Sequence, residues 1–135
     1  MTHLLDTSAL LAHYLAEPGA ERVQALFEDD AVVAGVSILS LYEFELRLHQ
    51  LGVDAATRAG ALSRYRALLN EVVDMDEAVR SEAIRLRITA TAHVAAMDVL
   101  IAATASLKNA TLVHRDPHFA AIPPGSLKQE VLPTK

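Results

Sequence analysis

Short β-branched or leucine-rich runs alternate along this chain with segments long enough for helices, and this alternation most limits the possible folds. The pattern is typical of parallel strands joined by crossover helices. The expected strands cover residues 2–5, 32–36, 71–74, 111–114 and, with the weakest signal, 128–132. The expected helices cover residues 8–16, 20–28, 38–51, 55–69, 77–90 and 95–107. We therefore predict an α/β fold: a three-layer α/β/α sandwich around a mostly parallel central sheet of four to five short strands.

No segment has the composition of a linker, a repeat or a low-complexity tract, so we expect residues 1–135 to form a single domain. A chain of this length buries about two-thirds of its unfolded surface, which is enough for one core. The absence of cysteine excludes disulfides, a thiol nucleophile and a thiolate zinc site. The N-terminus lacks a basic region, and the apolar stretch after it is interrupted by Asp6 and His13. We therefore expect no secretion signal and a cytoplasmic location.

The longest apolar run covers residues 92–107 and contains Asp98. It is shorter than the roughly 20 residues that span a bilayer, so it predicts a buried helix and no membrane contact. An aromatic content of 4% argues against extended stacking platforms for single-stranded nucleic acid, and a net charge of −5 argues against a wholly basic surface. Composition leaves the function open.

Parallel sheets bind ligands beyond the carboxyl ends of their strands. This rule selects Asp6, Ser37, Asp76 and the pair Arg115 and Asp116. Each acid has a structural alternative as well as a functional one. Asp6 is suited to cap the first helix, and Asp116, followed by proline, is suited to cap a short helix.

Two further acids lie on predicted helices. Glu43 stands three residues after Ser40, which is also the spacing of a capping box. Asp98 lies in a run without lysine or arginine, where a buried unpaired carboxylate costs several kcal/mol unless a metal ion or backbone donors compensate. The structural alternative places Asp98 at the N-cap of its helix, with Met97 outside.

Two carboxylates at strand ends and two on adjoining helices can converge at one edge of a parallel sheet. Oxygen ligands without cysteine suit a hard cation, so Mg²⁺ or Mn²⁺ fits better than zinc. These four acids also account for four of the five excess negative charges of the chain. The acidic balance therefore indicates a metal-loaded pocket on a nearly neutral domain.

Four segments, at residues 5–11, 36–43, 97–105 and 111–116, together resemble the PIN domain. Their order and spacing, with the total length, are similar to those of the VapC toxins of bacterial VapBC toxin–antitoxin modules. The resemblance covers nearly the whole chain. Any one of these motifs is weak evidence, whereas four in order are specific.

The resemblance implies a ribonuclease that uses Mg²⁺, with Mn²⁺ as a substitute, and cleaves RNA phosphodiester bonds. The implied catalytic and metal-binding residues are Asp6, Glu43, Asp98 and Asp116. Ser8 and His114 are implied to support them, although the family usually has threonine or serine at the position of His114. The family also implies a homodimer and a cognate VapB-like antitoxin that blocks the active site.

We predict that Arg115 contacts a substrate phosphate, because it borders Asp116. An aspartyl phosphatase also uses an acid at the end of the first strand, but Ser8 stands where its second acid is needed. A receiver domain needs paired early acids and a late strand-end lysine, and neither is evident. The alternative of a different class is a catalytically idle PIN-like module that binds protein or RNA.

Overall fold

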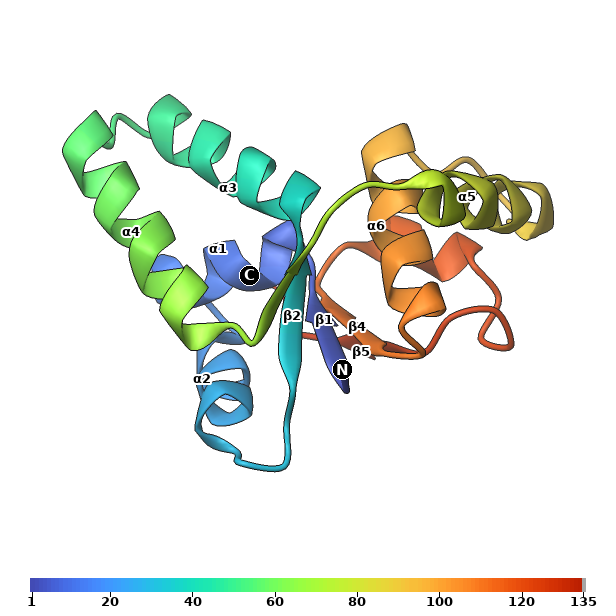
Figure 1. The fold of residues 1–135 in the computed structure, drawn as a ribbon, viewed down its shortest axis with the longest axis horizontal. Helices are drawn as coiled ribbons and strands as arrows, with labels where there is room; N and C mark the ends of the chain where they lie inside the picture. Colours follow the sequence, from blue (N-terminus) through green and yellow to red (C-terminus); the bar gives the residue numbers. More distant parts are fainter. Residues whose placement is uncertain (135) are drawn as a thin grey trace.

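The computed structural model describes residues 1–134 and contains a five-stranded sheet in the order β3-β2-β1-β4-β5. Every neighbouring pair of strands is parallel, which confirms the predicted α/β fold (Figure 1). The strands are β1 (His3–Leu5), β2 (Ala34–Ser37), β3 (Glu71–Val73), β4 (Thr111–His114) and β5 (Gln129–Val131). The helices are α1 (Thr7–Tyr14), α2 (Ala20–Glu28), α3 (Ile38–Gln50), α4 (Ala55–Leu68), α5 (Glu77–Thr89) and α6 (Ala96–Leu107), followed by the 3₁₀ turn η1 (Pro117–Ala121).

The central strands β1, β2 and β4 are mostly buried and rich in apolar residues, because both faces of the sheet are covered. Successive side chains point to opposite faces, so Leu4 packs into one buried cluster and Leu5 into the other. Leu112 and Val113 of β4 divide in the same way. The first cluster lies under α5 and α6, and the second lies under α1 to α4 (Figure 1). This arrangement is the predicted three-layer sandwich.

Polar side chains begin most of the helices. The residues Asp6, Ser37, Asp54 and Asp76 cap α1, α3, α4 and α5 by accepting backbone N–H groups. Because α3 begins at Ile38, Ser40 is inside the helix and the capping box with Glu43 is not formed. Likewise α6 begins after Ala95, so Asp98 belongs to its first turn and is not its N-cap.

All eleven predicted strands and helices are present, and their ends lie within two residues of the predicted ones. The apolar segment that ends at Leu107 is the buried helix α6, and it starts at Ala96. Within residues 1–134, no helix has the length and hydropathy required to cross a membrane.

Candidate active site

The acidic residues gather at the carboxyl edge of the sheet. Asp6 follows β1, Asp116 follows β4, and α3 starts directly from the end of β2. The N-terminal end of α6 faces the same edge (Figure 1). Parallel pairing of β1 with β2 and β4 in register aligns these ends, so residues far apart in sequence share one site.

Asp6 caps α1 with one carboxylate oxygen, and its other oxygen is buried without a partner among residues 1–134. Its Oδ2 accepts hydrogen bonds from the Ser8 hydroxyl, at 2.7 Å, and from the Ser8 N–H, at 3.2 Å. Its Oδ1 is buried and has no hydrogen-bond partner among residues 1–134. The carboxyl is only 4% exposed, and this burial raises its pKa from 3.8 to about 6. The cap therefore uses one oxygen and leaves the other available to a cation.

Ser8 ties two strand ends together around this carboxylate. Besides donating to Asp6, its hydroxyl accepts the N–H of Arg115 at 3.1 Å. The Ser8 side chain therefore connects the end of β1 to the segment after β4. The supporting role of Ser8 in catalysis stays a prediction.

Glu43 is held by a residue that the sequence analysis did not select. The Thr7 hydroxyl donates a 2.7 Å hydrogen bond to Glu43 Oε1, across 36 positions of sequence. Thr7 is the first residue of α1 and Glu43 lies in the second turn of α3. The bond fixes Glu43 beside the Asp6 end of β1. The only sequence signal for this role of Thr7 is that its hydroxyl directly follows Asp6.

Asp98 is the least constrained of the four acids. It makes no hydrogen bond or ion pair with any residue in the described part of the chain. Its place in the first turn of α6 favours negative charge, yet its pKa is raised from 3.8 to about 6. Burial is the main cause, and the negative charges of Asp6, Asp116 and Glu43 add to it in that order. Asp98 therefore lies within electrostatic reach of the other three predicted acids.

Asp116 caps the η1 turn by accepting the His118 N–H at 2.9 Å, and its Oδ1 is also 2.8 Å from His118 Nδ1. Its own N–H donates to Nδ1 of His114 at 3.1 Å. Because Nδ1 accepts this proton, His114 is a neutral ring protonated at Nε2, which donates to Gln129 Oε1 at 2.8 Å. Burial also lowers the pKa of His114, which agrees with a neutral ring.

His114 therefore orients the backbone of Asp116 rather than offering a nitrogen to the site. The ring is 1% exposed and packs against Phe119 at a centroid distance of 4.6 Å. Gln129 supports it by donating its amide to the Phe119 carbonyl at 3.1 Å. Nothing in the local sequence pointed to Gln129, because strand pairing alone brings it beside His114.

The donor set of the site fits a hard divalent cation. The four predicted residues are all carboxylates, and one buried oxygen lacks a partner among residues 1–134. Burial, with a smaller effect of neighbouring negative charge, raises the pKa values of Asp6 and Asp98. As placed, no three acidic or histidine side chains of residues 1–134 are grouped tightly enough to hold one ion. Asp98 interacts electrostatically with the other three acids, but the four do not form a closed coordination shell.

Arg115 does not face open solvent. Its guanidinium forms an ion pair with Glu17 and donates to the Pro18 carbonyl, and its side chain is 12% exposed. It therefore ties the segment before Asp116 to the turn between α1 and α2. Its predicted contact with phosphate requires it to exchange or share these partners.

The chain matches the PIN domain family model over residues 3–123. It therefore belongs to the PIN domain family. No curated protein sequence matches the chain.

Solved structures share the fold. The chain superposes on VapBC2 from Rickettsia felis bound to a promoter DNA fragment with a TM-score of 0.79 and 21% identity, over 98% of this chain and 100% of that chain. FitAcB from Neisseria gonorrhoeae gives a TM-score of 0.72 and 25% identity, over 95% of this chain and 96% of that chain. DNA-bound VapBC from Salmonella typhimurium gives a TM-score of 0.76 and 18% identity, over 97% of this chain and 98% of that chain.

Proposed function

We propose that this chain is a metal-dependent ribonuclease that acts as the VapC-type toxin of a type II toxin–antitoxin module. The observation that supports it best is the buried Oδ1 of Asp6, which has no partner among residues 1–134, at a sheet edge where Asp98 senses the charges of Asp6, Asp116 and Glu43. A site with this surplus of negative charge binds Mg²⁺, or Mn²⁺ in its place, through Asp6, Glu43, Asp98 and Asp116. Bound metal lowers the pKa of water and neutralises charge on a phosphate.

The residues of the chain hold and orient the acids. Ser8 leaves one oxygen of Asp6 free by occupying the other, and Thr7 fixes the position of Glu43. Asp98 has no competing partner within residues 1–134, so its carboxylate is available to a ligand. Burial at this edge limits the access of water, which strengthens the attraction between these carboxylates and a bound cation.

The proposal includes a VapB-like antitoxin, an RNA substrate, a homodimer and a cytoplasmic location. The solved relatives are described as VapBC and FitAB assemblies, several of them bound to DNA. By analogy, an antitoxin segment covers the acidic site of this chain and blocks it. Co-expression tests this part: the chain alone is expected to arrest growth, and its antitoxin is expected to relieve the arrest.

The test of the catalytic part is RNA cleavage by the purified protein in Mg²⁺ or Mn²⁺. Asp6→Asn and Asp98→Asn are expected to lose cleavage, because each removes a ligand charge. Full activity in both variants, with contaminating nuclease excluded, would contradict the mechanism. Asp54→Asn is the matched control, since Asp54 caps α4 with an exposed carboxylate.

The alternative is a catalytically idle PIN-like module that binds protein or RNA. The observation that favours it is the absence of a tight metal-binding group among residues 1–134. Calorimetry separates the two functions. A nuclease of this kind binds Mg²⁺ or Mn²⁺ in dependence on Asp6 and Asp98, whereas an idle module has no such requirement.

A further inference from the structure

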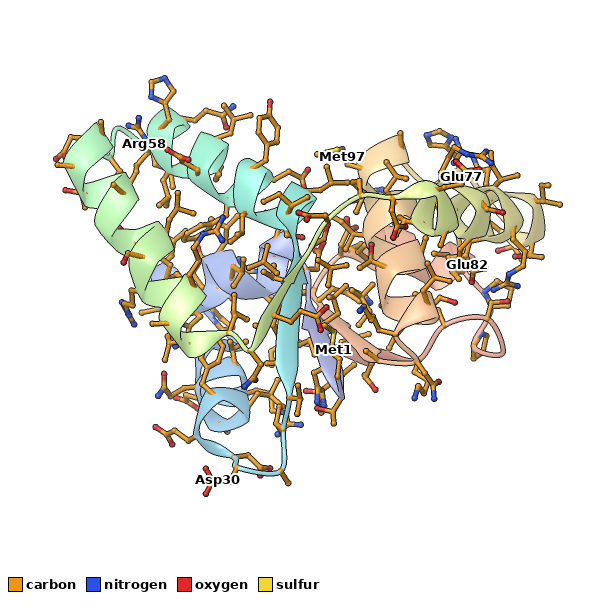
Figure 2. The ribbon with its side chains drawn as sticks, viewed as in Figure 1. Met1, Asp30, Arg58, Glu77, Glu82 and Met97 are labelled. Carbon is orange, nitrogen blue, oxygen red and sulfur yellow. The ribbon has the colours of Figure 1, made fainter. Side chains whose placement is uncertain are left out.

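A hollow of about 370 Å³ opens beside the acidic site. Thr7 and Glu43 form part of its lining, so it is continuous with the site rather than separate from it. Leu11 and Leu46 supply apolar surface from α1 and α3. Met97 reaches from the first turn of α6 toward α3 and completes the lining (Figure 2). The volume falls at the small end of the range for small-molecule sites, about 300–1,000 Å³.

An exposed aromatic ring stands at this hollow. Tyr42 precedes Glu43 directly and is 61% exposed. It lines both the 370 Å³ hollow and a second hollow of about 210 Å³. The other two tyrosines of the chain are less exposed, and Tyr65 is fully buried. Exposed aromatic rings beside a nuclease site are suited to stack unpaired bases.

A free cation stands next to the same hollow. Arg47 lies one helical turn after Glu43, is exposed, and forms no ion pair with residues 1–134. In contrast, the guanidinium groups of Arg85 and Arg115 are paired with carboxylates. Of the arginines beside the acids, Arg47 is therefore better placed than Arg115 to meet a phosphate.

Gln50 adds hydrogen-bonding capacity to the lining. It lies one turn after Arg47, is exposed, and its amide makes no hydrogen bond within the described chain. An amide offers one acceptor and two donors, which suits the edge of a base. The hollow thus combines a ring, a cation and an amide around an apolar floor.

We propose that this hollow binds one unstacked nucleotide of single-stranded RNA next to the scissile phosphate. Its base stacks on Tyr42, its phosphate pairs with Arg47, and Gln50 reads the edge of the base. The inference rests on the proposed ribonuclease function and names where its substrate enters. An RNA occupant is favoured over a second copy of the chain, because a nucleotide phosphate pairs with the charge of Arg47 that an apolar contact between two copies would bury unpaired.

The test measures binding of a fluorescent single-stranded octaribonucleotide of mixed sequence in EDTA, and its cleavage in Mg²⁺. Tyr42→Ala is expected to weaken binding about 5- to 150-fold, whereas Tyr42→Phe keeps the ring and stays within about twofold of wild type. Arg47→Ala is expected to weaken binding and to lower its salt dependence by about one phosphate contact. Gln50→Ala is expected to change which bases flank the cut.

Arg66→Ala is the matched control, because Arg66 is exposed on α4, has no ion pair within residues 1–134, and lines neither hollow. Its RNA affinity is expected to equal that of wild type. Thermal unfolding of each variant confirms that it is folded, and light scattering reports its mass.

Three results would overturn the inference: no RNA binding by wild type, wild-type affinity in both Tyr42→Ala and Arg47→Ala, or an equal loss in Arg66→Ala. A changed mass at unchanged RNA affinity would assign the hollow to a second copy. The binding assay does not require cleavage. If the variants show the expected binding pattern but wild type does not cleave RNA, the nucleotide site is retained and the nuclease function is rejected. If wild type cleaves RNA but the variants do not show that binding pattern, the nuclease function is retained and the nucleotide site is rejected.

Discussion

Asp6→Asn is expected to stabilise the metal-free protein while it abolishes metal binding. Asparagine keeps an oxygen that can accept from Ser8, so the α1 cap survives. The substitution removes a charge that is buried at 4% exposure beside other carboxylates. Without metal, the fold therefore disfavours the ionised form of Asp6, the form that is proposed to bind the metal.

The magnitude follows from the pKa. A folded-state pKa of about 6, against 3.8 for the ordinary carboxyl, corresponds to a cost of about 3 kcal/mol for keeping Asp6 ionised at pH 7.5. Neutral asparagine avoids this cost. With unfolding entropy of about 2.1 cal/mol/K per residue, the increase in Tm is on the order of 10 °C.

The assay is thermal and urea unfolding at pH 7.5, in EDTA and in excess Mg²⁺. In Mg²⁺ the wild type gains about 2.7 kcal/mol at a hundredfold excess over Kd, whereas Asp6→Asn gains little. Asp54→Asn is the control, because hydrogen bonds from Thr57 hold the pKa of the exposed Asp54 below its usual value. We expect a small loss of stability there. A destabilised Asp6→Asn in EDTA, or an equal gain from Mg²⁺ in both proteins, would refute the reasoning.

Three further measurements follow from the site. In EDTA, the raised pKa values of Asp6 and Asp98 favour the folded state fully below pH 3.8, and this contribution is lost as the pH rises through about 6, which urea unfolding across that range measures. Metal affinity is expected to rise over the same range, because protons compete with the ion. His114→Ala is expected to cost about 2–4 kcal/mol in unfolding free energy, since it removes two hydrogen bonds and a packed ring; an unchanged Tm would contradict this. Arg115→Ala separates its two roles: lower salt dependence of cleavage supports a phosphate contact, whereas unchanged rate and salt dependence leave only the tie to Glu17.

Much of the fold was predictable because it depends on local signals. Apolar runs and helical periodicity identified every strand and helix, and Asp54 was recognisable as the cap of α4. The strand-end rule also selected Asp6 and Asp116 from position alone. Two local interpretations were wrong. The capping box at Ser40 and the N-cap at Asp98 both failed because the helices begin earlier than those motifs require.

Residue identity and spacing were thus sufficient for the elements and their order, since these depend on neighbours within a few positions. The sheet order and the partners of the acids required the folded chain. Thr7 meets Glu43 across 36 positions, and Arg115 meets Glu17 across 98. Such contacts depend on how helices pack over the sheet, which no short segment encodes. The same packing buries Asp6, leaves one of its oxygens without a partner, and places Arg47 rather than Arg115 at an open surface.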